Sequence, residues 1–119
     1  MTDQQAVNWE QTLFTMILHA GNARSKALEA AEQAQNRDMR AAESALAEAE
    51  SEQVEAHKMQ ARVIEMEAGG QQVPFSVLLI HAMDLLLLSW AEIDHTRQMM
   101  NLCSCIHDLE RKVAEKWPG

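Results

Sequence analysis

The chain has 119 residues and a net charge of −8. This length supports one modest hydrophobic core, so we expect a single domain over residues 1–119. The negative charge argues against nucleic acid as a partner, because phosphate backbones reward clustered lysine and arginine. Ala, Glu, Gln, Leu and Met dominate, with only four glycines and two prolines, and this composition predicts an all-α fold.

A first helix is predicted over about residues 4–35, where apolar residues recur at three- and four-residue steps. The stripe consists of Ala6, Trp9, Leu13, Met16, Ile17, Ala20, Ala27, Ala31 and Ala34. Gly21 lies within this helix at a cost of about 1 kcal/mol relative to alanine, so we expect a neighbouring element to approach it closely. The helix is expected to end near residue 35, and Asp38 is a suitable N-cap for the next one.

A second helix is predicted over about residues 39–68. Its thin apolar face consists of Ala42, Leu46, Ala49, Val54, Ala61 and Ile64, with His57 on the side of Val54, Ala61 and Ile64. The small residues on this face indicate close packing against another helix. Gly69 and Gly70 suit the end of this helix, and Pro74 suits the first turn of the next one.

A third helix is predicted over about residues 75–116. Its segment Val77–Leu88 is apolar all the way round apart from His81 and Asp84, and such a helix must be covered on every side. Two other helices from the same chain cover at most two sides. We therefore expect an up-down-up antiparallel three-helix bundle that associates with further copies of itself.

The sequence also bears on the cellular compartment. The apolar segment of the third helix is shorter than the roughly 20 residues that a membrane span needs, and the first residues do not form a secretory signal. Cys103 and Cys105, two residues apart on a helix, point away from each other and cannot pair. We expect reduced thiols, no membrane insertion and a cytoplasmic location.

Among the five histidines, His81 stands out because it has a charged neighbour in the apolar segment. Asp84 lies three residues further on, so the two side chains are expected side by side on the helix. An unpaired carboxylate costs several kcal/mol when buried, so Asp84 is expected to be protonated, paired or bound to a cation. The pair is either a functional site or a satisfied buried pair, and the residues alone leave both open.

Three segments, in matching order, resemble the lactose/cellobiose (including chitobiose) enzyme IIA family of bacterial sugar phosphotransferase systems. The first, Ala20–Ser25 (Ala-Gly-Asn-Ala-Arg-Ser), is similar to the glycine-containing first helix of that family. The second, Glu55–Gln60 (Glu-Ala-His-Lys-Met-Gln), is similar to its Glu-Ala-His-x-x-Gln motif. The third, Ser76–Asp84, resembles the active segment around the His-[Ala/Gly]-Gln-Asp-His-Leu motif.

The resemblance implies a homotrimer with a nine-helix core, in which the third helices surround the three-fold axis. It implies that His81 accepts a phosphoryl group from the phosphorylated carrier protein HPr and passes it to a cysteine of a IIB component, for uptake of a β-linked disaccharide. It also implies that three copies of Asp84 share one divalent cation, and all-oxygen ligands suit Mg²⁺. His57 and Gln60 are candidate polar neighbours of this site, and a packed core histidine is the alternative for His57.

Several residues depart from the family pattern. Met83 and Leu85 stand where the family has Gln and a second His, which leaves a rival interpretation, a catalytically silent trimeric adaptor or regulatory subunit. Arg37 replaces a usual loop glycine, at about 1 kcal/mol if its backbone is left-handed. A histidine phosphotransfer domain of two-component signalling is disfavoured, because those domains usually carry Lys and Gly shortly after the histidine. The transported sugar is not encoded in this subunit.

Overall fold

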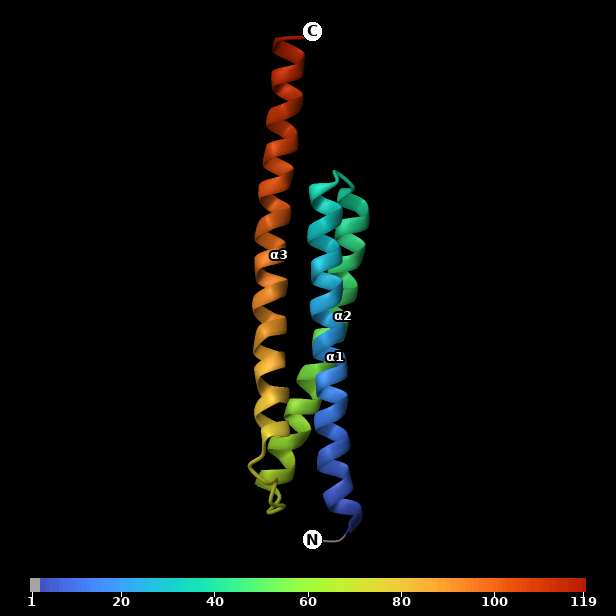
Figure 1. The fold of residues 1–119 in the computed structure, drawn as a ribbon, viewed down its shortest axis with the longest axis vertical. Coiled ribbons are helices and arrows are strands. Elements are labelled where there is room, and N and C mark those ends of the chain that lie inside the picture. Colours follow the sequence, from blue (N-terminus) through green and yellow to red (C-terminus); the bar gives the residue numbers. More distant parts are fainter. Residues whose placement is uncertain (1–2) are drawn as a thin grey trace.

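Three α-helices form the computed structural model, which describes residues 3–119 and their side chains from residue 9 onward. α1 spans Asp3–Gln35, α2 spans Met39–Ala68 and α3 spans Val77–Lys116, with no strand in these described residues. The helices run up, down and up, so the two chain ends lie at opposite ends of the molecule (Figure 1). The predicted all-α bundle is confirmed. Residues 1 and 2, and the side chain of Ala6, lie outside the described part.

Side-chain and backbone caps explain where the helices begin and end. The Asp38 carboxylate accepts a hydrogen bond from the Ala41 amide at 3.1 Å, as expected of an N-cap. α3 begins two residues later than predicted, because the Ser76 hydroxyl caps it by accepting from the Leu79 amide at 3.1 Å. Pro74 therefore lies in the preceding loop, and its predicted place in the first turn of α3 is wrong.

Small side chains let α1 and α2 pack closely along their upper halves. The core there consists of Ala23, Ala27, Ala30, Ala34, Ala42, Ala45, Leu46 and Ala49, with Ile93, Met100 and Cys103 from α3. On α2, one line of residues spaced seven apart is buried: Ala42, Ala49, Ala56 and Val63. The predicted burial of Val54 and Ile64 is wrong, because they project away from this line and are 54% and 57% exposed.

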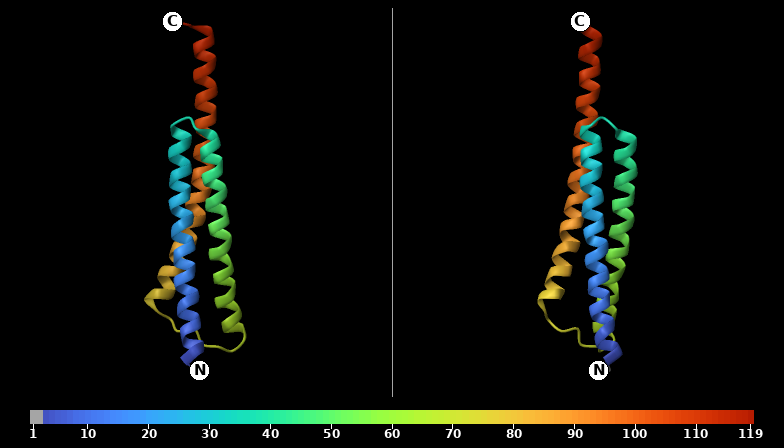
Figure 2. Two further views of the ribbon diagram at one scale, coloured as in Figure 1. Left: turned by 90° about the vertical axis from the view of Figure 1, so that its right-hand side faces the viewer. Right: turned by 45° about the vertical axis from the view of Figure 1, so that its right-hand side comes forward.

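α3 is longer than the hairpin that supports it. The molecule measures 74 × 20 × 17 Å, and its radius of gyration of 19.7 Å exceeds the roughly 13–14 Å of a compact chain of this length. Figures 1 and 2 show α3 continuing past the turn between α1 and α2 to the C-terminus. Despite its length, α3 is not apolar enough to cross a membrane, and neither of the other two described helices is.

The two opposite sides of α3 differ in what covers them. One side is buried against α1 and α2 through Ala82, Leu86, Ser89, Ile93, Thr96, Met100 and Cys103. We call the other side the open face; its exposed residues are Val77, Ile80, His81, Asp84, Leu88, Ala91, His95, Gln98, Leu102, Ile106, Leu109 and Val113. These side chains fall in one stripe along the helix. The expectation that a single subunit leaves α3 partly uncovered is confirmed.

The predicted close approach of a neighbouring element to Gly21 is wrong within this chain. Apart from Gly21, its two chain neighbours and the adjacent backbone of α1, no described atom lies within 4 Å of the position that a Cβ would take there. Gly21 lies on the side of α1 that turns away from the buried stripe, so neither α2 nor α3 approaches it.

The turn between α1 and α2 carries a strained residue that also contacts α3. Arg37 has a φ of 66°, in the left-handed region that favours glycine. Its guanidinium forms an ion pair with the carboxylate of Glu110, on the part of α3 next to this turn. The turn is therefore fastened to α3 by a side chain that glycine would lack.

We expect Arg37→Gly to leave stability nearly unchanged, because relief of about 1 kcal/mol of backbone strain is offset by loss of an exposed ion pair. In a Glu110→Gln background, where that pair is already absent, the same substitution is expected to stabilise the protein by about 1 kcal/mol. Denaturant unfolding at one chain concentration measures both differences. Equal effects in the two backgrounds would show that the ion pair contributes nothing.

Candidate functional site

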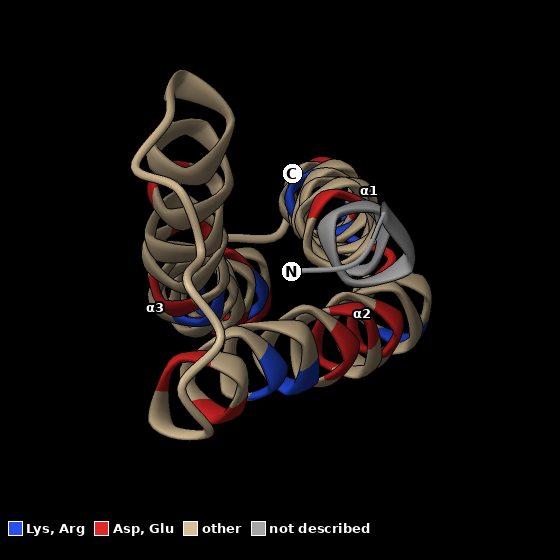
Figure 3. Ribbon diagram, turned by 90° about the horizontal axis from the view of Figure 1, so that it is seen from below, with Lys and Arg blue, Asp and Glu red and all other residues tan. Residues whose placement is uncertain are grey.

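His81 and Asp84 lie one helical turn apart on the open face, close to the start of α3. Both side chains are exposed, so the predicted burial of the pair is wrong for a single chain. The physical reason is that α1 and α2 cover the opposite face of the helix. Viewed from below, charged residues are frequent along α2, whereas the first part of α3 carries few (Figure 3): Asp84 is the one Asp, Glu, Lys or Arg between Val77 and Ala91.

The surroundings of His81 suit the approach of a protein partner that carries an anionic group. Side chains of a helix tilt toward its N-terminus, so the imidazole leans over the first turn of α3, where the helix dipole favours negative charge. Exposed apolar side chains lie on both sides of it in the sequence, with Phe75 and Val77 84% and 83% exposed. This combination offers an accessible nucleophile within an apolar contact surface.

The structure separates His57 from the segment around His81. The His57 ring packs against Trp90 with centroids 5.7 Å apart and is exposed. Gln60 reaches closer, since its Nε2 lies 3.7 Å from the Met83 sulfur, next to Asp84. The Trp90 contact was not anticipated from the sequence, because it depends on how α2 and α3 are aligned.

Met83 and Leu85 pack toward the interior rather than onto the open face. Both are partly buried against the lower core cluster. This cluster consists of Trp9, Leu13, Met16, Ala20, Ala56, Val63, Ala82 and Leu86. The two replacements for the polar residues of the family motif therefore contribute apolar packing beside the site.

A single chain offers one carboxylate at the proposed metal position. Among the described residues, no group of three His, Cys, Asp or Glu side chains is placed to hold a metal ion. The Asp84 carboxylate is a hard oxygen donor on the open face and fits Mg²⁺ chemistry, but only if other copies of the chain supply further oxygens. Cys103 is buried and Cys105 exposed, and neither forms a disulfide.

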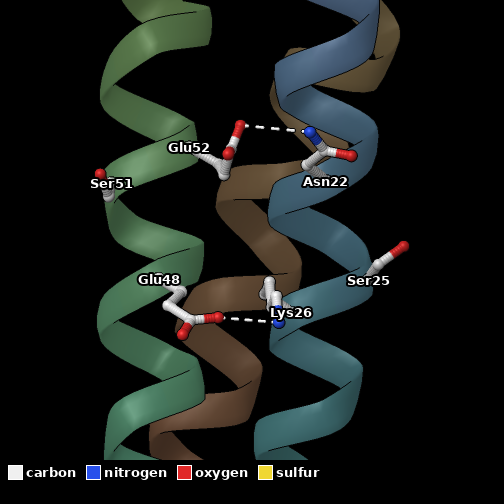
Figure 4. Close-up of a pocket in the computed structure, with 6 residues that line it drawn as sticks. All are labelled: Asn22, Ser25, Lys26, Glu48, Ser51 and Glu52. Carbon is white, nitrogen blue, oxygen red and sulfur yellow. Dashed lines mark hydrogen bonds and ion pairs between the residues drawn. The ribbon is translucent and has the colours of Figure 1, made fainter.

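A second polar cluster lies in the groove between α1 and α2, away from His81 (Figure 4). His19 Nδ1 donates to Glu52 at 2.5 Å, and Asn22 donates to the same carboxylate at 3.4 Å. The bond from His19 lowers the pKa of Glu52 below its ordinary 4.5, against an opposing effect of partial burial. Hydrogen bonds to Glu48 and Glu29 raise the pKa of the Lys26 ammonium. The contacts to Glu48 and Glu52 join α1 to α2.

An all-helical bundle with an accessible histidine at the start of its third helix has the features of a carrier domain that passes a group between proteins. The sequence profile of the PTS system, Lactose/Cellobiose specific IIA subunit, matches residues 11–104. The chain belongs to this family and is a phosphotransferase-system component, which confirms the resemblance read from the three segments.

Individual relatives agree with this assignment. The lichenan-specific phosphotransferase enzyme IIA component of Bacillus subtilis is 37% identical over 78% of this chain and 84% of its own length. The N,N'-diacetylchitobiose-specific EIIA component of Escherichia coli is 34% identical over 74% and 76%, respectively. The crystal structure of the cellobiose-specific enzyme IIA from Bacillus anthracis superposes with a TM-score of 0.82 at 35% identity, covering 91% of this chain and 94% of that one.

The lowered pKa of Glu52 predicts how stability depends on pH. Because the folded-state pKa lies below the ordinary 4.5, the stabilisation is complete above pH 4.5 and is lost as pH falls through the folded-state value. We expect Glu52→Gln to cost about 1 kcal/mol at pH 7 and progressively less as the pH falls below 4.5, in unfolding experiments across this range.

Glu55→Gln is the matched control for this measurement. Among the described side chains, Glu55 pairs only with Lys58 within α2, at 3.0 Å on the exposed surface, so its removal is expected to cost less than about 0.5 kcal/mol. A Glu52→Gln deficit that stays constant down to pH 3 would contradict the proposed role of the carboxylate.

Proposed function

We propose that this chain is the IIA phosphocarrier of a system that imports a β-linked disaccharide, and that His81 carries the phosphoryl group. The observation that carries the proposal is the exposed His81 at the start of α3, in a chain that belongs to the lactose/cellobiose IIA family. Phosphorylated HPr is the donor, a cysteine of a IIB component is the acceptor, and the exchange takes place in the cytoplasm. Relatives specific for lichenan and diacetylchitobiose support the β-linked class.

The transfer requires His81 to act first as nucleophile and then as leaving group. The lone pair of a neutral ring nitrogen, Nε2 by family resemblance, attacks the phosphorus of phosphohistidine on HPr; a new N–P bond forms as the donor's N–P bond breaks. In the second step a cysteine thiolate attacks, the S–P bond forms and His81 leaves. Imidazole suits both steps because it changes protonation near neutral pH. The first turn of α3 stabilises the phosphoryl charge.

We further propose that the working unit is a homotrimer with a nine-helix core and the three α3 helices around its axis. The open face supports this assembly, because it exposes large apolar side chains from Val77 to Val113 that a partner surface would bury. In this arrangement three Asp84 carboxylates meet and share one divalent cation, Mg²⁺ by ligand chemistry. The cation would neutralise their mutual repulsion and plays no part in the transfer steps above.

We expect the protein to take one phosphoryl group, about 80 Da, when incubated with phosphoenolpyruvate, enzyme I and HPr. Intact-mass spectrometry detects the label, which is expected to be labile in acid and stable in base. His81→Ala is expected to abolish it, because no other histidine lies beside the first turn of α3.

His57→Ala and His107→Ala are the controls, and both are expected to retain the label. Failure of the unaltered protein to accept phosphate would show that Met83 and Leu85 have disabled the site. A silent adaptor would then replace the phosphocarrier as the proposed function.

We expect sedimentation equilibrium at micromolar concentration to give about three times the chain mass of 13.4 kDa.

Asp84→Leu is expected to keep the trimer and to raise its metal-free melting temperature, because apolar replacements of buried charges often stabilise by about 1–4 kcal/mol. A chelator is expected to lower the melting temperature of the unaltered protein and not that of the variant. An equal chelator effect on both proteins would exclude the shared Asp84 site.

A further inference from the structure

A line of exposed leucines on α3 is interrupted by His95. Leu88, Leu102 and Leu109 are 46%, 64% and 62% exposed. Together with His95, also exposed, they stand at positions 88, 95, 102 and 109, seven residues apart. Seven residues make almost two full turns, so successive members of this line differ by only about 20° in direction.

On the opposite side of α3, a line with the same spacing is buried by the other two helices. Leu86, Ile93 and Met100 have the same seven-residue spacing and are 1%, 2% and 7% exposed against α1 and α2. A seven-residue apolar repeat is typical of parallel helices that pack side by side. The leucine line on the open face is therefore a second contact line, and His95 occupies one of its layers.

The surface that fits this leucine line is the same line on α3 of two further copies of the chain. The repeat is in register with itself, so identical helices place Leu88 against Leu88 and His95 against His95. The line continues onto the part of α3 that extends past the α1–α2 turn, where the hairpin does not obstruct other copies (Figures 1 and 2). This step rests on the trimer proposed above.

We propose that the three His95 side chains meet on the three-fold axis and bind one ion of the Zn²⁺ class. Imidazole nitrogen is a preferred ligand of Zn²⁺, and three histidines leave a fourth position for water or an anion. Three imidazoles brought together on the axis lose their water partners, a cost that coordination offsets. Ala91, one turn earlier on the open face, is small and leaves room for the His95 imidazole, which leans toward the N-terminus of the helix.

This site is distinct from the one proposed at Asp84. The two residues are eleven positions apart on α3, about 16 Å along the helix. Their chemistry also differs, because carboxylate oxygens favour Mg²⁺ whereas imidazole nitrogens favour Zn²⁺, Co²⁺ or Ni²⁺.

The test is a calorimetric titration of the chelator-treated full-length protein with ZnCl₂, alongside sedimentation equilibrium of the same samples. We expect one Zn²⁺ per three chains, a rise in melting temperature on loading, and a visible ligand-field spectrum of tetrahedral type when Co²⁺ is used instead. His95→Leu, which completes the leucine line, is expected to remain trimeric, to lose the binding phase and the Co²⁺ spectrum, and to melt higher than the unaltered protein without metal.

Three control variants separate this site from other ligands on α3. Asp84→Leu, Cys105→Ser and His107→Ala are each expected to bind Zn²⁺ as the unaltered protein does. His95→Gln, which keeps a polar side chain without an imidazole, provides a second variant that is expected to lose the same binding phase.

The outcomes distinguish this inference from the proposal on which it rests. A trimer that takes up no Zn²⁺, or one whose uptake survives both His95 substitutions, would overturn the His95 site and leave the proposed assembly intact. In the first case His95 would be only a polar layer in the contact line. A protein that sediments as a monomer with and without Zn²⁺ would overturn the trimer, and the His95 site with it.

Discussion

α3 carries apolar side chains on two opposite faces, and the hairpin of α1 and α2 covers only one of them. On the covered side Leu86, Ile93 and Met100 are almost completely buried, whereas on the open face Leu88, Leu102 and Leu109 remain about half exposed or more. Exposed large apolar side chains that recur along one helix face over this length are typical of an interface rather than of a free surface. The fold of one chain therefore leaves the burial of α3 incomplete.

The same imbalance determines the character of the candidate site. His81 and Asp84 lie on the uncovered face, so the hairpin neither buries nor hydrogen-bonds them. The exposure of His81 suits a carrier, because a group that passes between proteins must be reached from outside. In the trimer proposed above, self-association and partner docking would use neighbouring parts of one helix, because Asp84 lies at the centre of the open face and His81 toward its margin.

The departures from the family motif have a structural counterpart. Met83 and Leu85 flank the site in sequence but pack against the lower core cluster, so the polar groups they replace are exchanged for apolar contacts. Gln60 remains as a polar side chain at the Met83 sulfur, whereas His57 is engaged with Trp90. Of the two predicted polar neighbours, Gln60 is thus the better placed.

The sequence by itself determined the three helices, the bounds of α2, the Asp38 cap, the strain at Arg37 and the common face of His81 and Asp84. These features depend on hydrogen bonds and spacings within a few residues of the chain, which a local pattern encodes. Only the tertiary structure decided which face of α2 is buried, leaving Val54 and Ile64 in solvent. It also decided that neither α2 nor α3 approaches Gly21 closely and that His81 and Asp84 are exposed in a single chain. The rotation of a helix about its axis depends on the surface of its partner helices, and that surface is assembled from residues far apart in the sequence.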